Sequence, residues 1–325
     1  MKILITGAGS VMGQSIYKAL ARHSFSERVE VHVANSDETG AAFYFADPNL
    51  PIAARLILPL ARDERYSDAL SEYVRKHAID IVFSGTQHEL AKVAGLIEQG
   101  IKCATLPLKV ADICLDKAQS MRVFNAHNVR VPQTQSLRDF LKTPDFSNPG
   151  IIKPNTSSAS RRIRLFDKSS DVKIEDFDAA DVDDLIVQER LAGDEFTCGC
   201  YVDKFSGESH VITLRRTLTP DGATSFGEIV HDADIEKYVR SAARGLASEG
   251  FEFGHINVQL IVDRHGPCLF EVNGRLSSTE APKARFGFNS CAAYVVNLVD
   301  ETAYKNFEVS PKGKFLRYYE EVYWE

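Results

Sequence analysis

The chain has 325 residues, enough for two or three domains at roughly 150 residues each. Its 44% hydrophobic, 26% charged and 10% aromatic residues are typical of a globular protein and exclude collagen-like, disordered and disulfide-scaffold classes. The formal net charge of -7 disfavours binding to a nucleic-acid backbone, and no apolar run approaches the roughly 20 residues that cross a bilayer. We therefore expect a cytoplasmic protein with reduced cysteines that binds neither nucleic acid nor membrane.

The first segment, residues 1–113, alternates short apolar runs with helical patterns. The predicted strands cover residues 2–6, 29–35, 79–84 and 102–106, and the predicted helices cover residues 14–23, 66–76 and 89–100. Alternation of this kind predicts an open parallel sheet with helices on both faces, an α/β domain.

A glycine-rich turn joins the first strand to the first helix. Gly7, Gly9 and Gly13 are spaced one residue wider than the common dinucleotide fingerprint, and an acidic residue for the ribose is only loosely placed near Asp37. Two interpretations remain open, a site for NAD(P) and a tight turn without a ligand. The second is favoured by the rest of the chain.

The remaining residues predict two α+β segments. In residues 114–190 a helix is predicted over 117–127 and strands over 150–153, 162–166 and 185–188. In residues 191–325 strands are predicted over 195–202, 210–214, 255–262 and 267–272, with one helix over 235–248. Because these last strands are joined by tight turns, they favour an antiparallel sheet.

The last two strands carry the most specific pattern. If their hairpin is centred near His265, Gln259 lies opposite Glu271, and Glu271, Asn273 and Arg275 project from one face. One carboxylate with two amide oxygens suits a Mg²⁺ ion that is also held by phosphate oxygens, and Arg275 adds a cation for phosphate. These residues predict a magnesium site.

Two lysines and two glutamates precede this hairpin in positions that point to a nucleotide. Lys153 ends an apolar strand, where burial is costly unless an anion is its partner, and Lys117 begins a helix, where the dipole prefers an acid. Together they predict a clamp for a nucleoside triphosphate. Glu189 and Glu195 flank a turn through Gly193, and their carboxylates are placed to accept hydrogen bonds from ribose or adenine.

In this order the pieces resemble the ATP-grasp superfamily, and within it the carboxylate–amine ligases similar to the large subunit of carbamoyl phosphate synthetase. The matching pieces are residues 3–13, 80–90, Asp116-Lys117, Ile151-Ile152-Lys153-Pro154, Gln188-Glu189, Gly193-Asp194-Glu195, Gln259 and Glu271-Val272-Asn273-Gly274-Arg275. The resemblance implies an N-terminal domain without NAD, a small lid over residues 114–190, and a C-terminal domain with the metal site.

The resemblance also implies roles for single residues. Lys117 and Lys153 would contact the phosphates of ATP, Gln188, Glu189 and Glu195 would serve adenosine, and Gln259, Glu271 and Asn273 would hold Mg²⁺, with Lys153 and Arg275 catalytic. One departure concerns the loop after Lys153, which is glycine-rich in the family but reads Asn-Thr-Ser-Ser-Ala-Ser here. Its hydroxyl groups, Ser157 and Ser158 among them, can still donate to phosphates.

We therefore expect an ATP- and Mg²⁺-dependent ligase that activates a small carboxylate as an acyl phosphate and transfers it to an amine. Arg215, Arg216, Lys283 and Arg285 are candidates to hold the carboxylate, and a homodimer is compatible with the sequence. The alternatives are an NAD(P)-dependent oxidoreductase, which rests on the glycine turn, and a nucleotide-binding module without turnover.

Overall fold

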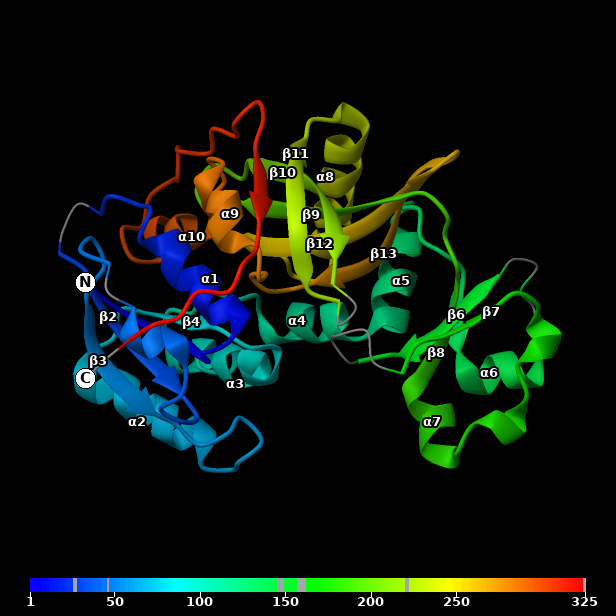
Figure 1. Cartoon of the computed structure of the whole chain (residues 1–325), viewed down its shortest axis with the longest axis horizontal. Helices are drawn as coiled ribbons and strands as arrows, with labels where there is room; N and C mark the ends of the chain where they lie inside the picture. The colour runs from blue at the N-terminus through cyan, green and yellow to red at the C-terminus, as the bar shows by residue number, and fades with distance from the viewer. Residues whose placement is uncertain are drawn as a thin grey trace.

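The computed structural model describes residues 1–25, 28–45, 47–144, 146, 149–156, 162–219 and 222–323, with no side chain described at residues 180 and 181. Within these residues the strands form three sheets (Figure 1), a parallel one near the N-terminus, a small antiparallel one and a larger antiparallel one. The expected combination of α/β and α+β parts is confirmed.

The N-terminal sheet has the order β3-β2-β1-β4, and its neighbouring strands are parallel. Its strands are β1 (Lys2–Thr6), β2 (Glu30–Asn35), β3 (Ile52–Ile57) and β4 (Ile81–Ser84). Its helices are α1 (Val11–Leu20), α2 (Tyr66–His77) and α3 (Leu90–Ala94). The carboxyl ends of β1 and β4 lie side by side, which is where open α/β sheets place their ligands.

Two elements of this sheet differ from the prediction. β3 was not predicted, because it is an edge strand whose alternate side chains are exposed and which lacks an apolar run. The strand predicted over residues 102–106 is reduced to a parallel bridge between Val82 and Cys103. The chain has little room to extend it, because Pro107 begins α4 (Leu108–Leu115) a few residues later.

The glycine turn is packed against the protein itself. Gly7 has φ +52°, and a Cβ there would lie 2.5 Å from a side-chain carbon of Thr86 and 2.6 Å from a carboxylate oxygen of Glu89. A Cβ on Gly9 would lie 2.9 Å from Gly40 Cα. The glycines thus allow close approach of neighbouring loops, which is the tight-turn interpretation.

The small sheet, which we call the lid sheet, has the order β5-β8-β6-β7 and is antiparallel. Its strands are β5 (Thr134–Ser136), β6 (Gly150–Pro154), β7 (Arg164–Phe166) and β8 (Leu185–Glu189), and its helices are α6 (Leu137–Lys142) and α7 (Ala179–Asp184). A compact core that includes Phe140, Ile152, Phe166 and Val187 holds it together.

The large sheet has the order β13-β12-β9-β10-β11-β14 and is antiparallel. Its strands are β9 (Asp194–Val202), β10 (Ser209–Leu218), β11 (Thr224–Val230), β12 (Gly254–Asp263), β13 (Gly266–Asn273) and β14 (Lys314–Leu316). The accompanying helices are α8 (Ala233–Ala247), α9 (Glu280–Arg285) and α10 (Ser290–Leu298). Gln259 pairs with Glu271 across the β12–β13 hairpin, so its predicted register is confirmed.

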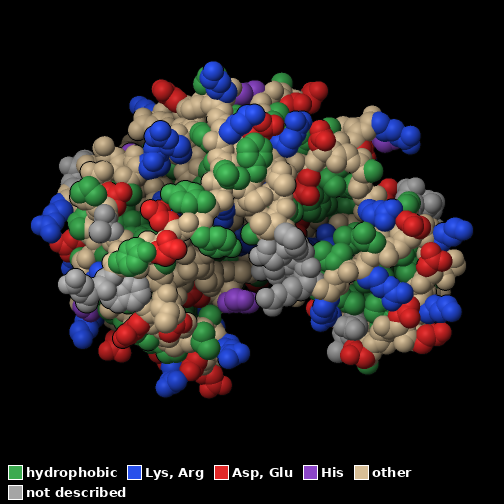
Figure 2. All heavy atoms as spheres, in the orientation of Figure 1, with side chains coloured by type: hydrophobic (Ala, Val, Ile, Leu, Met, Phe, Trp, Pro, Cys, Tyr) green, Lys and Arg blue, Asp and Glu red, His purple; other side chains and the backbone are tan. Residues whose placement is uncertain are grey.

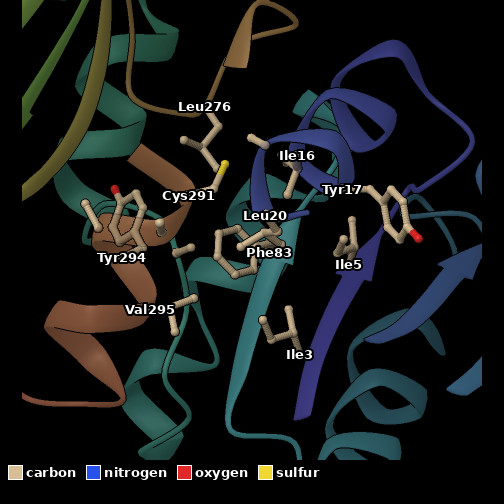
Figure 3. Packing of buried hydrophobic residues seen from close by; sticks show 14 of the residues in the cluster. Ile3, Ile5, Ile16, Tyr17, Leu20, Phe83, Leu276, Cys291, Tyr294 and Val295 are labelled. Carbon is tan, nitrogen blue, oxygen red and sulfur yellow. The ribbon is translucent and has the colours of Figure 1, made fainter. Parts of the chain in front are cut away.

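Two hydrophobic cores cross between the expected segments. In one, shown in Figure 3, Ile3, Ile5 and Phe83 of the parallel sheet pack with α1 and with Tyr294 and Val295 of α10. In the other, α5 (Lys117–Ala126) buries Met121 and Phe124 against the large sheet, although the sequence places this helix in the lid segment. Among the described residues, no helix combines the length and apolar character needed to span a bilayer.

Candidate functional site

A cavity of about 340 Å³ lies between the lid sheet and the large sheet. Figure 2 shows the lid at the right, with the surface hollowed between it and the rest of the molecule. The apolar side chains of the lining include Ile151, Ile163, Leu191, Ile261 and Phe270, and the polar ones are Lys117, Lys153, Gln188, Glu189, Arg190, Glu195, Arg216, Gln259 and Glu271. Seven of the residues that the sequence assigned to a site therefore meet here: Lys117, Lys153, Gln188, Glu189, Glu195, Gln259 and Glu271.

The two lysines enter the cavity from different elements that share one anchor. Lys153 projects from the end of β6, while Lys117 is the first residue of α5, whose N-cap Asp116 accepts a hydrogen bond of 2.7 Å from Gln119 N. Just after β6, Asn155 accepts from Lys117 Nζ at 3.3 Å through its carbonyl oxygen and from Ala118 N at 2.9 Å through its side chain. The residue after β6 thereby positions Lys117, whose charge lies close enough to Lys153 to affect the pKa of that lysine.

Burial and neighbouring charges shift the pKa values of Lys153 and Glu271 in this cavity. Burial lowers the pKa of Lys153 to about 8, an effect opposed by Glu271 and reinforced by Lys117. Burial would raise the pKa of Glu271, but the positive charges of Lys117 and Lys153 and a hydrogen bond from Asn273 hold it below its usual value. Glu271 is therefore ionised at neutral pH beside the positive charges of Lys117 and Lys153.

The predicted metal residues lie together at the end of the β12–β13 hairpin. Asn273 Nδ2 donates a hydrogen bond of 3.1 Å to Glu271 Oε1, and Gln259 is paired with Glu271 on the adjacent strand. An ionised carboxylate beside amide oxygens is the hard donor set that magnesium accepts when phosphates supply further oxygens. The described residues contain no group of three or more His, Cys, Asp or Glu positioned to hold a metal.

Arg216, on β10, occupies a more central position than the sequence indicated. Its Nε and Nη2 donate to Glu195 Oε1 at 3.1 and 2.6 Å, and Nη2 also donates to Gln259 Oε1 at 2.7 Å. The side chain is only 11% exposed. Sequence reasoning grouped Arg216 with three other cations, and nothing in its local pattern indicated that it would join Glu195 to Gln259.

The other three candidate carboxylate binders lie outside the lining of the cavity. Arg215 projects away and pairs with Asp194 at 3.2 Å. Lys283 is fully buried and donates to Glu280 at 3.1 Å, so its charge is already paired in the core. Arg285, on α9, is exposed.

Residues 188–195 form the strip between lid and large sheet. Gln188 is buried and its amide donates to Thr134 Oγ1 at 3.0 Å, and Glu189 accepts from the backbone N–H of Gln133 at 3.4 Å. A Cβ on Gly193 would lie 2.1 Å from Val262 O, so the strip needs glycine to cross β12 closely.

Arg275 turns toward the parallel sheet and does not line the cavity. Its Nε donates to Gln87 Oε1, in the turn after β4, and Nη1 donates to Leu276 O at 3.1 Å. Leu276 packs near Cys291 and Ile16 (Figure 3), which anchors this segment. Arg275 thus faces the carboxyl edge of the N-terminal sheet, two residues beyond the metal set. Ser157 and Ser158 lie outside the described residues.

Two family models match the chain. Residues 181–319 match the one described as ATP-grasp in the biosynthetic pathway with Ter operon, and residues 3–105 match the one described as PylC-like, N-terminal domain. The first covers the strip and the large sheet, and the second covers most of the parallel sheet and its helices.

Individual proteins are similar to the chain at low identity. Phosphoribosylamine–glycine ligase of Methanobrevibacter smithii is 21% identical over 317 residues, covering 86% of this chain and 68% of that enzyme. The crystal structure of L-amino acid ligase from Bacillus licheniformis is 17% identical with a TM-score of 0.68, covering 91% of this chain and 73% of that one.

A third structure is that of the biotin carboxylase domain of 2-oxoglutarate carboxylase from Hydrogenobacter thermophilus, crystallised with magnesium ADP, ADP and bicarbonate. It is 12% identical with a TM-score of 0.74, covering 96% of this chain and 73% of that one. These likenesses establish the fold, and the model matched by residues 181–319 places the cavity residues of the large sheet within an ATP-grasp family. The chain thus has the fold of the ATP-grasp proteins, and its residues 181–319 match an ATP-grasp family.

Proposed function

We propose that the protein is an ATP-dependent ligase that joins a small carboxylate to an amine and forms ADP and phosphate. The observation that carries the proposal is the cation-rich cavity, which Lys117, Lys153 and Arg216 from three elements line together with the carboxylate of Glu271. Ligases of this kind are among the proteins that the chain is similar to.

The proposed reaction has two steps. A carboxylate oxygen of the substrate attacks the γ-phosphorus of ATP, and the bond to the β,γ-bridging oxygen breaks, which gives an acyl phosphate and ADP. The amine nitrogen then attacks the acyl carbon, inorganic phosphate leaves with its oxygen, and the nitrogen loses a proton. Positioning and charge neutralisation carry most of such catalysis, so no side-chain nucleophile is needed.

The chain's own residues divide the nucleotide between them in this proposal. Lys117 and Lys153 bind phosphate oxygens, and Gln188, Glu189 and Glu195 orient the adenosine. The apolar part of the lining, formed by Ile151, Ile163, Ile261 and Phe270, gives the adenine ring a slot between the two sheets. The hydroxyl groups of Ser157 and Ser158 would complete the phosphate contacts.

The metal set fits Mg²⁺ because Glu271 is ionised and Asn273 is held beside it. A magnesium ion held by these residues would supply charge neutralisation for the phosphates of the nucleotide. The oxygen ligands for the ion would come from Glu271 and Asn273, with Gln259 adjacent. The hydrogen bond between Asn273 and Glu271 keeps these two side chains oriented.

The carboxylate substrate is placed where Arg275 meets the parallel sheet. Arg275 is fixed by Gln87 and Leu276 and lies close along the chain to the metal set, so it can hold a carboxylate at the edge of the nucleotide site. In this assignment residues 1–113 help to bind substrate, residues 114–190 cover the nucleotide and residues 191–325 carry the metal.

The test begins with ligand-dependent thermal stability of the whole protein. ATP with Mg²⁺ should raise the melting temperature, whereas NADH or NADPH should not. Lys153→Met should abolish most of the shift, and Lys168→Met, at an exposed lysine of the lid segment, should keep it. A shift produced by NADPH alone would overturn the proposal.

Turnover is then measured as ADP release in the presence of pooled amino acids and other small carboxylates, with and without amines. Release that requires both a carboxylate and an amine supports the ligase. ATP binding without ADP release under any pool would instead indicate a nucleotide-binding module without turnover.

A further inference from the structure

Gln259 is the predicted metal ligand that Asn273 does not contact. Arg216 donates a hydrogen bond to it. Gln259 Oε1, the atom that would face a metal ion, accepts a hydrogen bond of 2.7 Å from Arg216 Nη2. Glu195 fixes the same guanidinium through two further hydrogen bonds, at 2.6 and 3.1 Å. A guanidinium held by a carboxylate and an amide, with its side chain only 11% exposed, has little freedom to move away.

The rest of the guanidinium is available to a ligand. Nη1 of Arg216 has no hydrogen-bond partner among the residues that the structure describes, and the side chain lines the cavity beside Lys153 and Glu271. Its positive charge therefore stands on the nucleotide side of Gln259. A neutral amide oxygen that already accepts from a cation is a poor ligand for a second cation, because the two positive charges would be neighbours.

The remaining oxygen donors suffice for one ion. Glu271 and Asn273 are joined by their own hydrogen bond, and Glu271 is the one carboxylate of the predicted set. Two divalent ions would add four positive charges to a lining in which four cations already face three carboxylates; the cations are Lys117, Lys153, Arg190 and Arg216, and the carboxylates are Glu189, Glu195 and Glu271. The net charge of the lining favours fewer metal ions than an acidic site would accept.

Building on the proposed function, we propose that this site binds its nucleotide with a single divalent cation, held by Glu271 and Asn273, and that Arg216 takes the place of a second. Gln259 then serves as a positioning residue that orients the guanidinium. Arg216 binds the phosphate group through Nη1, so that the protein itself supplies part of the charge that a second ion would bring.

The experiment counts Mn²⁺ bound to the whole protein at a saturating, non-hydrolysable ATP analogue. Free Mn²⁺ is measured by electron paramagnetic resonance, and bound nucleotide is measured in the same equilibrium dialysis. One Mn²⁺ per bound nucleotide is expected for the wild type. Two per nucleotide would overturn the inference while leaving the proposed function intact, whereas no binding of the analogue would refute the proposed function itself.

Two variants at adjacent positions of β10 test whether Arg216 contributes to nucleotide affinity. Arg216→Met should weaken the analogue about tenfold or more, because a charge-assisted contact is lost. The matched control is Arg215→Met, which removes a guanidinium that pairs with Asp194 outside the cavity and should bind like the wild type. Nucleotide affinity within twofold of wild type in Arg216→Met would overturn the inference.

A double variant tests whether guanidinium and metal substitute for each other. Arg216→Met with Gln259→Glu replaces the cation by a second carboxylate, and it should bind two Mn²⁺ per nucleotide and regain part of the lost affinity. Circular dichroism and melting temperature establish that each variant is folded. A single Mn²⁺ in the folded double variant, with no gain in affinity over Arg216→Met, would count against the substitution.

Discussion

Two groups of charged residues lie along the same face of β12, one beside Gln259 and the other beside His255 and Asn257, and they differ in how their charge is balanced. The cavity cluster comprises Lys117, Lys153, Glu195, Arg216 and Glu271. The core cluster comprises His255, Asn257, Ser277, Glu280 and Lys283, and each of its members is at most 7% exposed. Both bury a lysine near a glutamate, yet only one of them lines a cavity.

In the core cluster the lysine is fully satisfied by the protein. Lys283 Nζ donates to Asn257 Oδ1 at 3.0 Å, to Ser277 Oγ at 3.0 Å and to Glu280 Oε1 at 3.1 Å, which uses all three of its N–H groups. Its charge holds the pKa of Glu280 at about 2, although burial alone would raise it. Such a pair fixes the segment that follows Arg275 and has no capacity left for a ligand.

In the cavity cluster the cations exceed the anions that face them. Burial lowers the pKa of Lys153 to about 8, which is the sign of an ammonium group without sufficient compensation. The contrast with Lys283 shows that burial of a charged side chain does not identify a site. A charge that lacks compensation and lies next to a cavity does identify a site, because a ligand of opposite charge can bind there.

The largest effect is expected from breaking the core pair. Lys283→Met leaves Glu280 buried without its cation and should lower the free energy of unfolding by about 3–5 kcal/mol. Denaturant titration at pH 7 measures the loss, and Arg285→Met, an exposed position on the same helix, is the control. A loss below about 1 kcal/mol would show that the pair does not stabilise the fold.

Breaking the cavity cluster should affect activity and leave the fold intact. Glu271→Gln removes the only charged oxygen ligand of the metal set, so Mg²⁺-dependent ADP release should fall about 100-fold or more. The melting temperature should not fall, because the variant removes a buried charge from a cavity. Activity close to that of the wild type would remove Glu271 from the metal site.

A smaller effect is expected at the phosphate lysine. Lys153→Ala should weaken ATP about tenfold or more while leaving adenosine within a few fold, since the lysine meets phosphates and not the base. In the wild type, Lys153 loses its proton as the pH rises through about 8, so ATP affinity should fall above that pH. The alanine variant should lack this decline, and calorimetric titration at pH 7 and 9 measures both effects. Equal losses for ATP and adenosine would contradict the assignment.

The last effect concerns acid stability and involves His255 of the core cluster. Burial lowers the pKa of His255 to about 3 from an ordinary value of 6.5. Between pH 6.5 and about 3, His255 is therefore protonated in the unfolded state but not in the folded state. The free energy of unfolding consequently falls as the pH drops below 6.5. The slope from this histidine is at most about 1.4 kcal/mol per pH unit.

Unfolding titrations of the wild type and His255→Phe between pH 7 and 4 measure this contribution. The phenylalanine variant should lose less stability on acidification, because no histidine remains to be protonated in the unfolded state. Parallel curves for the two proteins would show that His255 does not titrate in this range.

The sequence by itself determined the elements whose residues are neighbours along the chain. Period-two alternation and the short turn between Asp263 and Gly266 were enough to pair Gln259 with Glu271, because strand periodicity and turn length fix the register of a hairpin. The nucleotide site was indicated by the local setting of Lys117 at a helix start and of Lys153 at a strand end, and by the resemblance to the ATP-grasp superfamily. The edge strand β3 could not be predicted, since its side chains alternate between exposed and partly exposed positions and it lacks an apolar run.

Only the tertiary structure decided which charges are partnered. Arg216 reaches Gln259 across 43 positions of sequence and Arg275 reaches Gln87 across 188, so no local pattern contains either contact. Lys283 and Arg216 carry the same charge and read alike in the sequence. Lys283 is buried among three acceptors, whereas Arg216 lines a cavity. The environment of a side chain depends on which elements pack together, and that packing is fixed by burial of apolar surface throughout the fold.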